Sequence, residues 1–339
     1  MKSMCKMAAC LIFVSTAPTF AAEPNNFYQG KQVQFLIRAE PGGSYDLYMR
    51  TLAKYMVKYI PGSPTIIPVN MPGGGGLKSL NYLDAVAPHD GTAVAMITQT
   101  APLEQALGSN SNLKTDLNAL NWIGNMSEEN TFLVVRASSE TKSLKDAETR
   151  VTPLAASCAS GSDYLLANIL NTIYQTKFKS VLGYQSSPQM DMAIQRGEAD
   201  GRFTASLAGL FSTSKEGAKG FRILVQIGSN PDAGFPDAPF LKRIPSDQPE
   251  AVNIISAVMS LGRPVATNSG VPADRVAILR TAFDETMKDT DFLRDAEKQQ
   301  LDISPWSGAE TQKVVDEIIH AKDSTKEFLN TAITSDKND

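Results

Sequence analysis

The stretch that decides the fold lies between a predicted strand and a predicted helix and reads Ala39-Glu40-Pro41-Gly42-Gly43-Ser44-Tyr45-Asp46. Upstream, Val33, Phe35 and Ile37 alternate with their neighbours in the period of two that indicates a strand. Downstream, the face of one helix collects Tyr45, Tyr48, Leu52, Tyr55, Met56 and Tyr59. A strand followed by a Gly-Gly turn and a helix start leaves backbone N–H groups free, and the helix dipole there favours an anion.

The kind of anion follows from the position of the loop and from the glycine patterns that it lacks. A loop of this type is expected at the carboxyl end of a parallel strand, where open α/β sheets bind their ligands. Neither G-x-G-x-x-G nor G-x-x-x-x-G-K-[ST], the patterns that hold nucleotide phosphates, accompanies it. The loop therefore favours a small carboxylate over a nucleotide.

The order of strand, loop and helix continues along the chain. Residues 65–69 form a predicted strand, the glycine-rich residues 70–76 follow, and a helix begins at Leu77. A turn at residues 88–91 leads into the continuously apolar strand 93–97. This order predicts the α/β fold class, with a parallel or mixed sheet that carries helices on both faces.

The second half of the chain repeats this plan. Further strands are predicted at residues 132–135, 152–156 and 222–227. A second loop of small residues at 157–163 precedes a helix, as the Gly-Gly loop does. Ser187 with Pro188 predicts the start of another helix, and Gly197 its end. The last predicted helices span 272–289 and begin at Ser307, where Ser307 and Glu310 form a capping box.

The first 21 residues have the pattern of a secretory leader. Lys2 and Lys6 form a basic start, residues 7–17 an apolar core, and Thr19-Phe20-Ala21 a small-residue cleavage site. The apolar run is too short to span a bilayer, and it continues past Cys10, which disfavours a lipid anchor there. We therefore expect export to the periplasm, with cleavage of the signal peptide near Ala21.

Composition limits the remaining function classes. Loss of Lys2 and Lys6 with the leader changes the formal net charge from −4 to −6, and without a basic tract no nucleic acid is expected as a partner. Cys158 then remains alone of the 3 cysteines, so no intramolecular disulfide can form. The 2 histidines have no metal-ligand spacing, and no G-x-S-x-G sequence is present. We therefore expect no metal, no cofactor and no catalytic residues.

Several short motifs, each weak alone, follow one another in the order found in one known family. They are Glu40-Pro41-Gly42-Gly43-Ser44-Tyr45-Asp46, Tyr48-Met49-Arg50, Ile60-Pro61-Gly62-Ser63-Pro64-Thr65, Asn70-Met71-Pro72-Gly73-Gly74-Gly75, Ala87-Pro88-His89-Asp90-Gly91-Thr92, Gly183-Tyr184, Arg196-Gly197-Glu198-Ala199-Asp200-Gly201-Arg202, Gly262-Arg263-Pro264 and Gly270-Val271-Pro272-Ala273-Asp274-Arg275. Together they resemble the periplasmic substrate-binding receptors of tripartite tricarboxylate transporters, called Bug proteins. The resemblance covers essentially the whole chain after the leader.

The resemblance implies a type II periplasmic-binding-protein fold, in which two α/β lobes are joined by two crossing strands and close on a ligand by hinge motion. After the signal peptide of residues 1–21, it implies a discontinuous first domain of residues 22–126 and 260–339 and a second domain of residues 127–259. The two crossings are expected near residues 122–133 and 257–266.

The resemblance also places the ligand between two loops, one in each lobe, that bind its carboxylate largely through backbone N–H groups and water. The matching loops are Gly42, Gly43, Ser44, Tyr45 and Asp46 in the first lobe and residues 157–162 in the second, with Ser160, Gly161 and Ser162 as the candidate contacts. Gln99 and Thr100, at the end of the third strand, are further candidates from their position alone. Each of these residues also has a structural explanation that needs no ligand. These explanations are a positive-φ turn for the glycines, helix caps for the serines, a packing position for Tyr45, a polar loop for Gln99 and Thr100, and dipole compensation for Asp46.

Three larger side chains are further candidates. Tyr184 follows a strand and is a candidate to stack on the ligand, or else fills a core position. Arg202 is a candidate for a bidentate clamp on a distal carboxylate, or else pairs with Asp200 or Glu198. Arg38, where the family usually has a small or apolar residue, is a candidate second anion contact, or else pairs with Glu40.

These observations predict an extracytoplasmic solute-binding receptor rather than an enzyme. The expected protein is a monomer without cofactor that captures a small carboxylate and delivers it to the membrane permease subunits of a tripartite tricarboxylate-type transporter. The alternative is a receptor of the same fold that feeds a sensor kinase, because both roles need the same ligand-induced closure. A hydrolase is the least favoured class.

Overall fold

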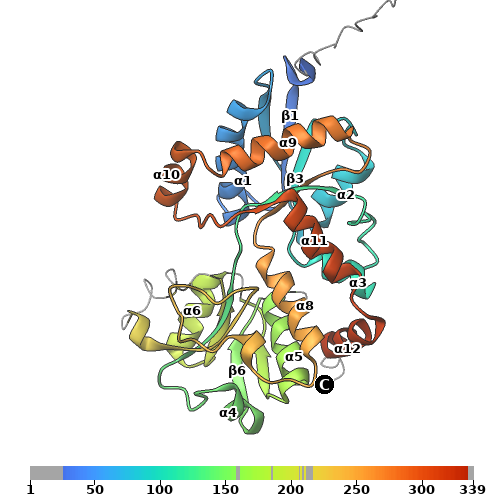
Figure 1. Ribbon diagram of the computed structural model, residues 1–339. Coiled ribbons are helices and arrows are strands. Elements are labelled where there is room, and N and C mark those ends of the chain that lie inside the picture. The colour runs from blue at the N-terminus through green and yellow to red at the C-terminus, as the bar shows by residue number, and fades with distance from the viewer. Residues whose placement is uncertain are drawn as a thin grey trace, which may run out of the picture.

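The computed structural model describes residues 26–157, 161–184, 186–205, 207, 210 and 217–334. The chain forms two lobes, stacked one above the other in Figure 1, and each lobe is built around its own sheet. The leader, Cys158 and Ser160 lie outside the described residues, so the expectations for them stay predictions. In the part of the chain that is described, no helix combines the length and the apolar character needed to cross a membrane.

The first lobe contains a six-stranded sheet in the order β11-β4-β10-β3-β1-β2. Its strands are β1 (Gln32–Ile37), β2 (Thr65–Asn70), β3 (Ala93–Met96), β4 (Asn121–Asn125), β10 (Pro264–Thr267) and β11 (Trp306–Ser307). Strand β1 runs parallel to both β2 and β3, so the loops that follow these three strands leave the same edge of the sheet. Strand β10 returns from the second lobe and pairs antiparallel with β3 and β4.

Helices cover both faces of this first sheet, as the sequence predicts. They are α1 (Ser44–Met56), α2 (Leu77–Ala85), α3 (Ala101–Leu107), α9 (Ala273–Thr286), α10 (Thr290–Lys298) and α11 (Gly308–Ile319). Val33, Phe35 and Ile37 of β1 join the apolar cluster that contains Leu52 of α1, whereas Leu36 joins the cluster on the opposite face. The alternating pattern of β1 therefore buries both faces of the strand.

The second lobe contains a five-stranded sheet in the order β7-β6-β8-β5-β9. Its elements are β5 (Thr131–Arg136), α4 (Leu144–Thr149), β6 (Thr152–Ala155), α5 (Ser162–Tyr174), β7 (Phe178–Val181), α6 (Ser187–Arg196), β8 (Gly201–Thr204), β9 (Phe221–Ile227) and α8 (Pro249–Ser260). Strand β6 is parallel to β7 and β8, and β5 is antiparallel to β8 and β9. Helix α6 ends at Gly197 as predicted, but Ser186 rather than Ser187 occupies its N-cap position.

Short 3-10 helices occupy several turns between these elements. They are η1 (Asn26–Tyr28), η2 (Val57–Tyr59), η3 (Gly74–Gly76), η4 (Gly217–Gly220) and η5 (Leu241–Arg243). The turn η3 belongs to the glycine-rich loop between β2 and α2, where Gly73, Gly74, Gly75 and Gly76 all have positive φ. Glycine adopts such angles without a steric penalty, so this loop exposes backbone rather than side chains.

Two connections join the lobes beside each other. Residues 126–130 lead from β4 to β5, and residues 261–263 lead from α8 back to β10. They meet in an antiparallel bridge between Glu128 and Leu261. This arrangement is the two-lobed α/β fold with two crossings that the sequence predicts.

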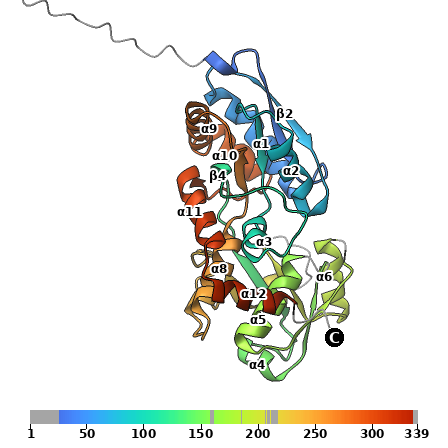
Figure 2. The same cartoon turned by 90° about the vertical axis from the view of Figure 1, so that its right-hand side faces the viewer.

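The C-terminal helix α12 (Asp323–Thr334) forms a third link between the lobes. It packs against α5 and α8 of the second lobe and against α3 of the first, and Figure 2 shows it beside α5 and below α3. Lys322 Nζ, just before α12, lies 2.6 Å from Glu250 Oε2 of α8. One apolar cluster contains Leu36 of β1, Leu154 of β6 and Leu329 of α12, so the core continues from one lobe to the other. The predicted domain boundaries stay predictions.

Candidate functional site

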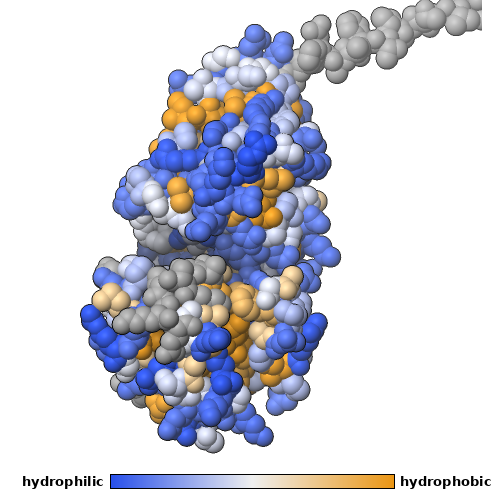
Figure 3. Space-filling model, turned by 90° about the vertical axis from the view of Figure 1, so that its left-hand side faces the viewer, coloured by the Kyte–Doolittle hydropathy of each residue, from blue (hydrophilic) through white to orange (hydrophobic). Residues whose placement is uncertain are grey.

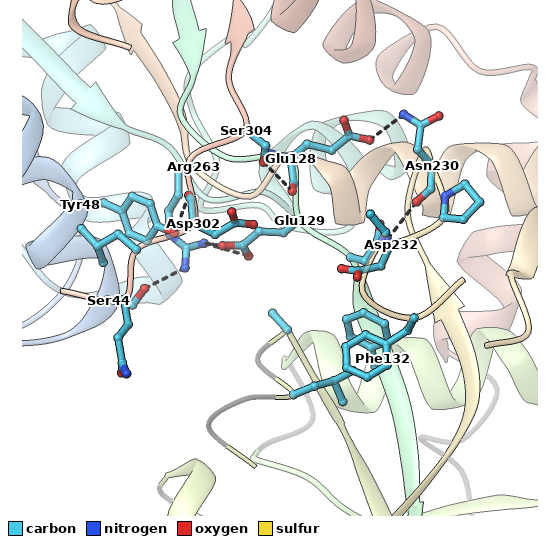
Figure 4. Close-up of a pocket in the computed structure, with 18 residues that line it drawn as sticks. Ser44, Tyr48, Glu128, Glu129, Phe132, Asn230, Asp232, Arg263, Asp302 and Ser304 are labelled. Atoms are coloured by element: carbon cyan, nitrogen blue, oxygen red, sulfur yellow. Dashed lines mark hydrogen bonds and ion pairs between the residues drawn. The ribbon is translucent and has the colours of Figure 1, made fainter. Parts of the chain in front are cut away.

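Among the described residues, two cavities open between the lobes. The first, which we call the three-loop cavity, has a volume of about 830 Å³ and is lined by the loops after β1, β2 and β3 and by the start of α5. The second, which we call the hinge cavity, has a volume of about 620 Å³ and is lined by the crossing segments and by residues of both lobes (Figure 4). Figure 3 shows the hollow between the lobes on one face of the molecule.

The three-loop cavity brings together chain segments that are far apart in the sequence. The parallel strands β1, β2 and β3 end at one edge of the sheet, so their loops meet there. Helices α2 and α3 begin at this cavity, and Gly161 and Ser162 bring the first turn of α5 to it from the second lobe. The dipoles at the helix starts favour an anion in this space, although the N–H groups of Lys78 in α2 and Ala101 in α3 already donate to Gly73 and Thr98.

The charged side chains of the three-loop cavity support the same conclusion. Arg38 and Lys78 are its cations, and Glu104 is its acid. Glu104 is engaged at the start of α3, because its carboxylate accepts hydrogen bonds from Thr100 Oγ1 at 3.0 Å and from Asn110 Nδ2 at 2.8 Å. The two cations outnumber the single carboxylate, so the charged side chains that line the cavity are positive in sum.

Tyr45 lies between two guanidinium groups. The guanidinium carbon of Arg38 is 4.2 Å from the centroid of its ring, and that of Arg263 is 4.6 Å from it. Arg38 donates from Nη2 to the carbonyl oxygen of Gly75 at 2.7 Å, so its partner is the glycine-rich loop rather than Glu40, the structural alternative in the sequence. Tyr45 therefore separates the three-loop cavity, which Arg38 lines, from the hinge cavity, which Arg263 lines.

Asp46, in the first turn of α1, is hydrogen-bonded to the Gly-Gly loop that precedes this helix. Its buried carboxylate accepts hydrogen bonds from the N–H of Gly42 at 2.9 Å, Nε of Arg50 at 2.8 Å and Nδ2 of Asn70 at 2.8 Å. Burial acts to raise the pKa of Asp46, but these hydrogen bonds outweigh it and hold the pKa below its ordinary value of 3.8. The carboxylate thus stabilises the loop as an anion.

The structure corrects two details of this loop. A positive φ occurs at Gly42, where φ is +84°, whereas Gly43 has the ordinary value of −76°. Gly43 is also the N-cap of α1, so Ser44 is the first helical residue and not the cap. Ser44 Oγ instead accepts a hydrogen bond from Arg263 Nη2 at 2.8 Å.

Arg263 lines the hinge cavity and contacts several of the other residues that line it. Its Nη1 lies 3.0 Å from Glu129 Oε1, and its guanidinium carbon lies 4.7 Å from the centroid of Tyr48, whose pKa burial raises to about 12. Four carboxylates line the same cavity, from Glu128, Glu129, Asp232 and Asp302 (Figure 4). Burial raises the pKa of Glu129, which Arg263 opposes, and burial together with Asp232 raises the pKa of Asp302. This acidic cavity disfavours an anionic ligand.

The predicted site residues do not all line one cavity. Those that line the three-loop cavity are Tyr45, Gln99, Thr100, Gly161 and Ser162. Ser44 lines the hinge cavity, and Gly42, Gly43 and Asp46 build the first loop without lining either cavity. Tyr184 and Arg202 lie elsewhere in the second lobe, and Ser160 is outside the described residues.

Arg202 has a structural partner that the sequence did not indicate. Its Nε donates to Asp191 Oδ1 at 2.6 Å, and the two side chains are only 4% and 6% exposed. Of the alternatives expected from the sequence, Asp200 pairs with Arg136 and Glu198 lies near Arg196. Arg202 lines neither cavity, so its role as a ligand clamp stays a prediction that this geometry does not support.

Tyr184 packs in the second lobe against the apolar cluster that contains Met190 and Ile194. Its hydroxyl lies 3.4 Å from Glu198 Oε2, and burial, with a smaller contribution from Glu198, raises the pKa of the tyrosine. Like Arg202, it lines neither cavity.

Sequence reasoning missed Lys78, Glu129 and Arg263. Arg263 stood in the motif Gly262-Arg263-Pro264, between the apolar segments that form α8 and β10. A lone arginine between two buried segments must find a partner inside the protein, and that signal was available. Among the described residues, no group of histidine, cysteine, aspartate and glutamate is placed to hold a metal ion.

Solved structures share this fold. A TctC solute-binding protein from Polaromonas, without ligand, is 17% identical with a TM-score of 0.71, over 91% of this chain and 99% of that chain. MatC from Rhodopseudomonas palustris with bound malate is 17% identical with a TM-score of 0.62, over 88% and 99%. Another R. palustris protein, with adipate, is 15% identical with a TM-score of 0.64, over 88% and 97%. No family model and no curated protein matches the sequence. These likenesses confirm the predicted fold class.

Proposed function

We propose that this protein is an extracytoplasmic solute-binding receptor, which captures a small carboxylate between its lobes and delivers it to a tripartite tricarboxylate-type membrane transporter. One observation carries the proposal. Three helix starts and the cations Arg38 and Lys78, which form no ion pair with the described residues, converge on a cavity of about 830 Å³ that both lobes line. Preformed N–H donors and positive charge in such a cavity are the means by which proteins bind small anions.

The solved structures with the same fold support a carboxylate as the ligand. MatC is described with malate and the second R. palustris protein with adipate, and both molecules are small dicarboxylates. The hinge cavity is a weaker candidate, because its four carboxylates repel such a ligand.

The cavity also supplies a reason for hinge closure. Gln99 and Thr100 reach it from the first lobe, and Gly161 and Ser162 from the second. A carboxylate that accepts hydrogen bonds from both sides binds the closed arrangement more tightly than the open one, and so shifts the population toward closure. The crossings at residues 126–130 and 261–263 are the segments that bend.

The remaining parts of the proposal follow from the sequence. The chain is exported to the periplasm after removal of residues 1–21 and acts as a monomer, with permease subunits in the membrane as its partners. It is a binding protein without cofactor, and it is not an enzyme. The division into domains of residues 22–126 with 260–339 and of residues 127–259 belongs to the same proposal.

A thermal-shift screen followed by calorimetry tests the function. The panel contains aliphatic mono-, di- and tricarboxylates, acidic amino acids, benzene carboxylates and neutral sugars. A ligand at a hundredfold excess over its Kd adds about 2.7 kcal/mol to the free energy of unfolding, which corresponds to a rise in Tm of about 5–10 °C. A shift with sugars alone, or with none of the carboxylates, would overturn the proposal.

A matched pair of variants locates the binding site. Ser162→Asp places a negative charge on the first residue of α5 inside the three-loop cavity, and we expect it to abolish carboxylate binding. Ser187→Asp makes the same change on the first residue of α6, which lines neither cavity, and should bind as the wild type does. An acidic residue in the first helical turn is favourable in both helices, so neither variant is expected to lose stability.

A further inference from the structure

Arg38 is a half-buried cation without a carboxylate partner among the described residues. The deeply buried arginines of this protein differ in that respect, because Arg202 pairs with Asp191 and Arg263 pairs with Glu129. The Nε of Arg38 is buried and has no hydrogen-bond acceptor among the described residues, which carries an uncompensated desolvation cost. An anionic group bound in the three-loop cavity would supply the missing counter-ion.

The position of the Arg38 guanidinium is fixed in advance. The hydrogen bond from Nη2 to the Gly75 carbonyl holds one end of the guanidinium, and the guanidinium lies over the ring of Tyr45. Gly76 packs directly against the side chain, since a Cβ at residue 76 would lie 2.5 Å from Nε of Arg38. A guanidinium whose orientation is already set loses little further entropy when it binds a ligand.

Donors remain on this group for a ligand. The described residues provide one hydrogen-bond acceptor to Arg38, the Gly75 carbonyl, which leaves Nη1 and the second hydrogen of Nη2 unused by them, and Arg38 lines the cavity. Lys78, the first-turn cation of α2, lines the same side, and its stem packs against Gly73. A fork of guanidinium N–H groups matches the two oxygens of a carboxylate.

We propose that Arg38 binds the second carboxylate of a small dicarboxylate, whose first carboxylate is held at the start of α5 by Ser162. The ligand class of the three-loop cavity is therefore dicarboxylates rather than monocarboxylates, and Arg38 determines this specificity. The inference rests on the proposed function, because it assigns the far end of the same ligand.

Ligand pairs of equal chain length test the role of Arg38. Calorimetry measures the Kd of succinate with butyrate, glutarate with pentanoate and adipate with hexanoate, for the wild type and for Arg38→Met. Methionine keeps apolar contact with Tyr45 but removes the charge. For the best-bound pair, we expect the wild type to prefer the dicarboxylate by about 10- to 100-fold, and the variant to lose that preference while its affinity for the monocarboxylate changes little.

Two further variants control for charge and folding. Arg294→Met removes one positive charge from the exposed face of α10, far along the chain from the cavity residues, and should keep the full preference. Arg38→Lys keeps the charge but not the fork, and should keep part of the preference. If Arg38→Met does not fold, the preference of Arg38→Lys for the dicarboxylate tests the inference in its place.

The possible results separate the inference from the proposed function. Equal affinity of the wild type for mono- and dicarboxylates would overturn the role of Arg38 and leave the receptor function intact. Equal loss of both ligands in Arg38→Met and Arg38→Lys would assign Arg38 to the scaffold of the site and would also overturn the inference. Absence of all carboxylate binding would overturn the proposed function, and the inference with it.

Discussion

Arg263 and Glu129 form an ion pair between the two connections that join the lobes, with Nη1 of the arginine 3.0 Å from Oε1 of the glutamate. The two residues are 134 positions apart in the sequence, and their side chains are 10% and 14% exposed. The same guanidinium also donates to Ser44 and stacks on Tyr45. Arg263 therefore links the hinge to the loop that begins α1.

Removal of Arg263 should destabilise the protein strongly. Arg263→Ala leaves Glu129 buried without its counter-ion, and we expect the free energy of unfolding to fall by about 3–5 kcal/mol. Urea unfolding at pH 7 measures the effect. Arg294→Ala is the control, because the exposed pair of Arg294 with Asp291 is worth at most about 1 kcal/mol. The double variant Arg263→Met with Glu129→Met should lose less than the two single variants together, and strict additivity would contradict a coupled pair.

The charge of Asp46 should make the stability of the first loop depend on pH. Its pKa is lower in the folded state than the ordinary 3.8, so the stabilisation is present above that value and is lost as pH falls through the folded-state pKa. Asp46→Asn should therefore unfold about 1–3 kcal/mol more easily at pH 7, with the difference from the wild type shrinking below pH 3.8. Unfolding curves between neutral and acidic pH measure it. A difference that stays constant across that range would count against this role of the carboxylate.

Arg202→Ala should affect stability more than ligand choice. If Arg202 were the clamp that the sequence offers as one alternative, this variant would weaken ligands with a second carboxylate selectively, by about 1.5–3 kcal/mol. The buried pair with Asp191 predicts instead a loss of about 3–5 kcal/mol in the free energy of unfolding. Asp191→Asn should destabilise in the same direction. If Arg202→Ala folds normally and discriminates against dicarboxylates, the clamp role holds for Arg202 and not for Arg38.

The two glycines of the first loop should respond differently to substitution. Gly42 has a φ of +84°, which alanine adopts at a cost, so Gly42→Ala should lower the free energy of unfolding by about 1–2 kcal/mol. Gly43 has a φ of −76°, and a Cβ there would meet the Glu40 carbonyl at an ordinary 3.5 Å. Gly43→Ala should therefore change stability by less than about 0.5 kcal/mol. The reverse order in thermal unfolding would refute this assignment of the turn.

Gly43→Val also tests the ligand role of the loop. The sequence predicts that a side chain at this position blocks close approach of the ligand to backbone N–H groups and abolishes binding. Since the φ of Gly43 is ordinary, the variant should fold, and calorimetry with the carboxylate panel can then measure binding by itself. Normal affinity would show that this loop is only a connection.

The leader prediction is tested by mass spectrometry of the exported protein. We expect the mature chain to begin at Ala22 or within one or two residues of it, because the Thr19-Phe20-Ala21 site follows an uninterrupted apolar core. A mature chain that keeps Cys10 with a lipid attached would replace the free periplasmic receptor by an anchored one.

The sequence by itself determined the local elements and their order. The alternation in Val33, Phe35 and Ile37 gave strand β1, the pair Ser307 and Glu310 formed the capping box of α11, and the small-residue loops preceded α1 and α5. Such features depend on neighbours within a few residues, whose geometry follows from backbone periodicity and capping. The order of the short motifs along the chain then extended the prediction from local elements to the two-lobed fold.

Only the tertiary structure decided which charges meet. Arg202 pairs with Asp191 and Arg263 with Glu129. Arg38 contacts the Gly75 carbonyl and the ring of Tyr45, and no carboxylate of the described residues pairs with it. Sequence spacing carries no information on such pairs, because the partners lie on different elements and the packing of whole sheets and helices sets their distance. An electrostatic interaction falls with distance and grows with burial, so the functions of these arginines are fixed by the assembled fold and not by their neighbours in the chain.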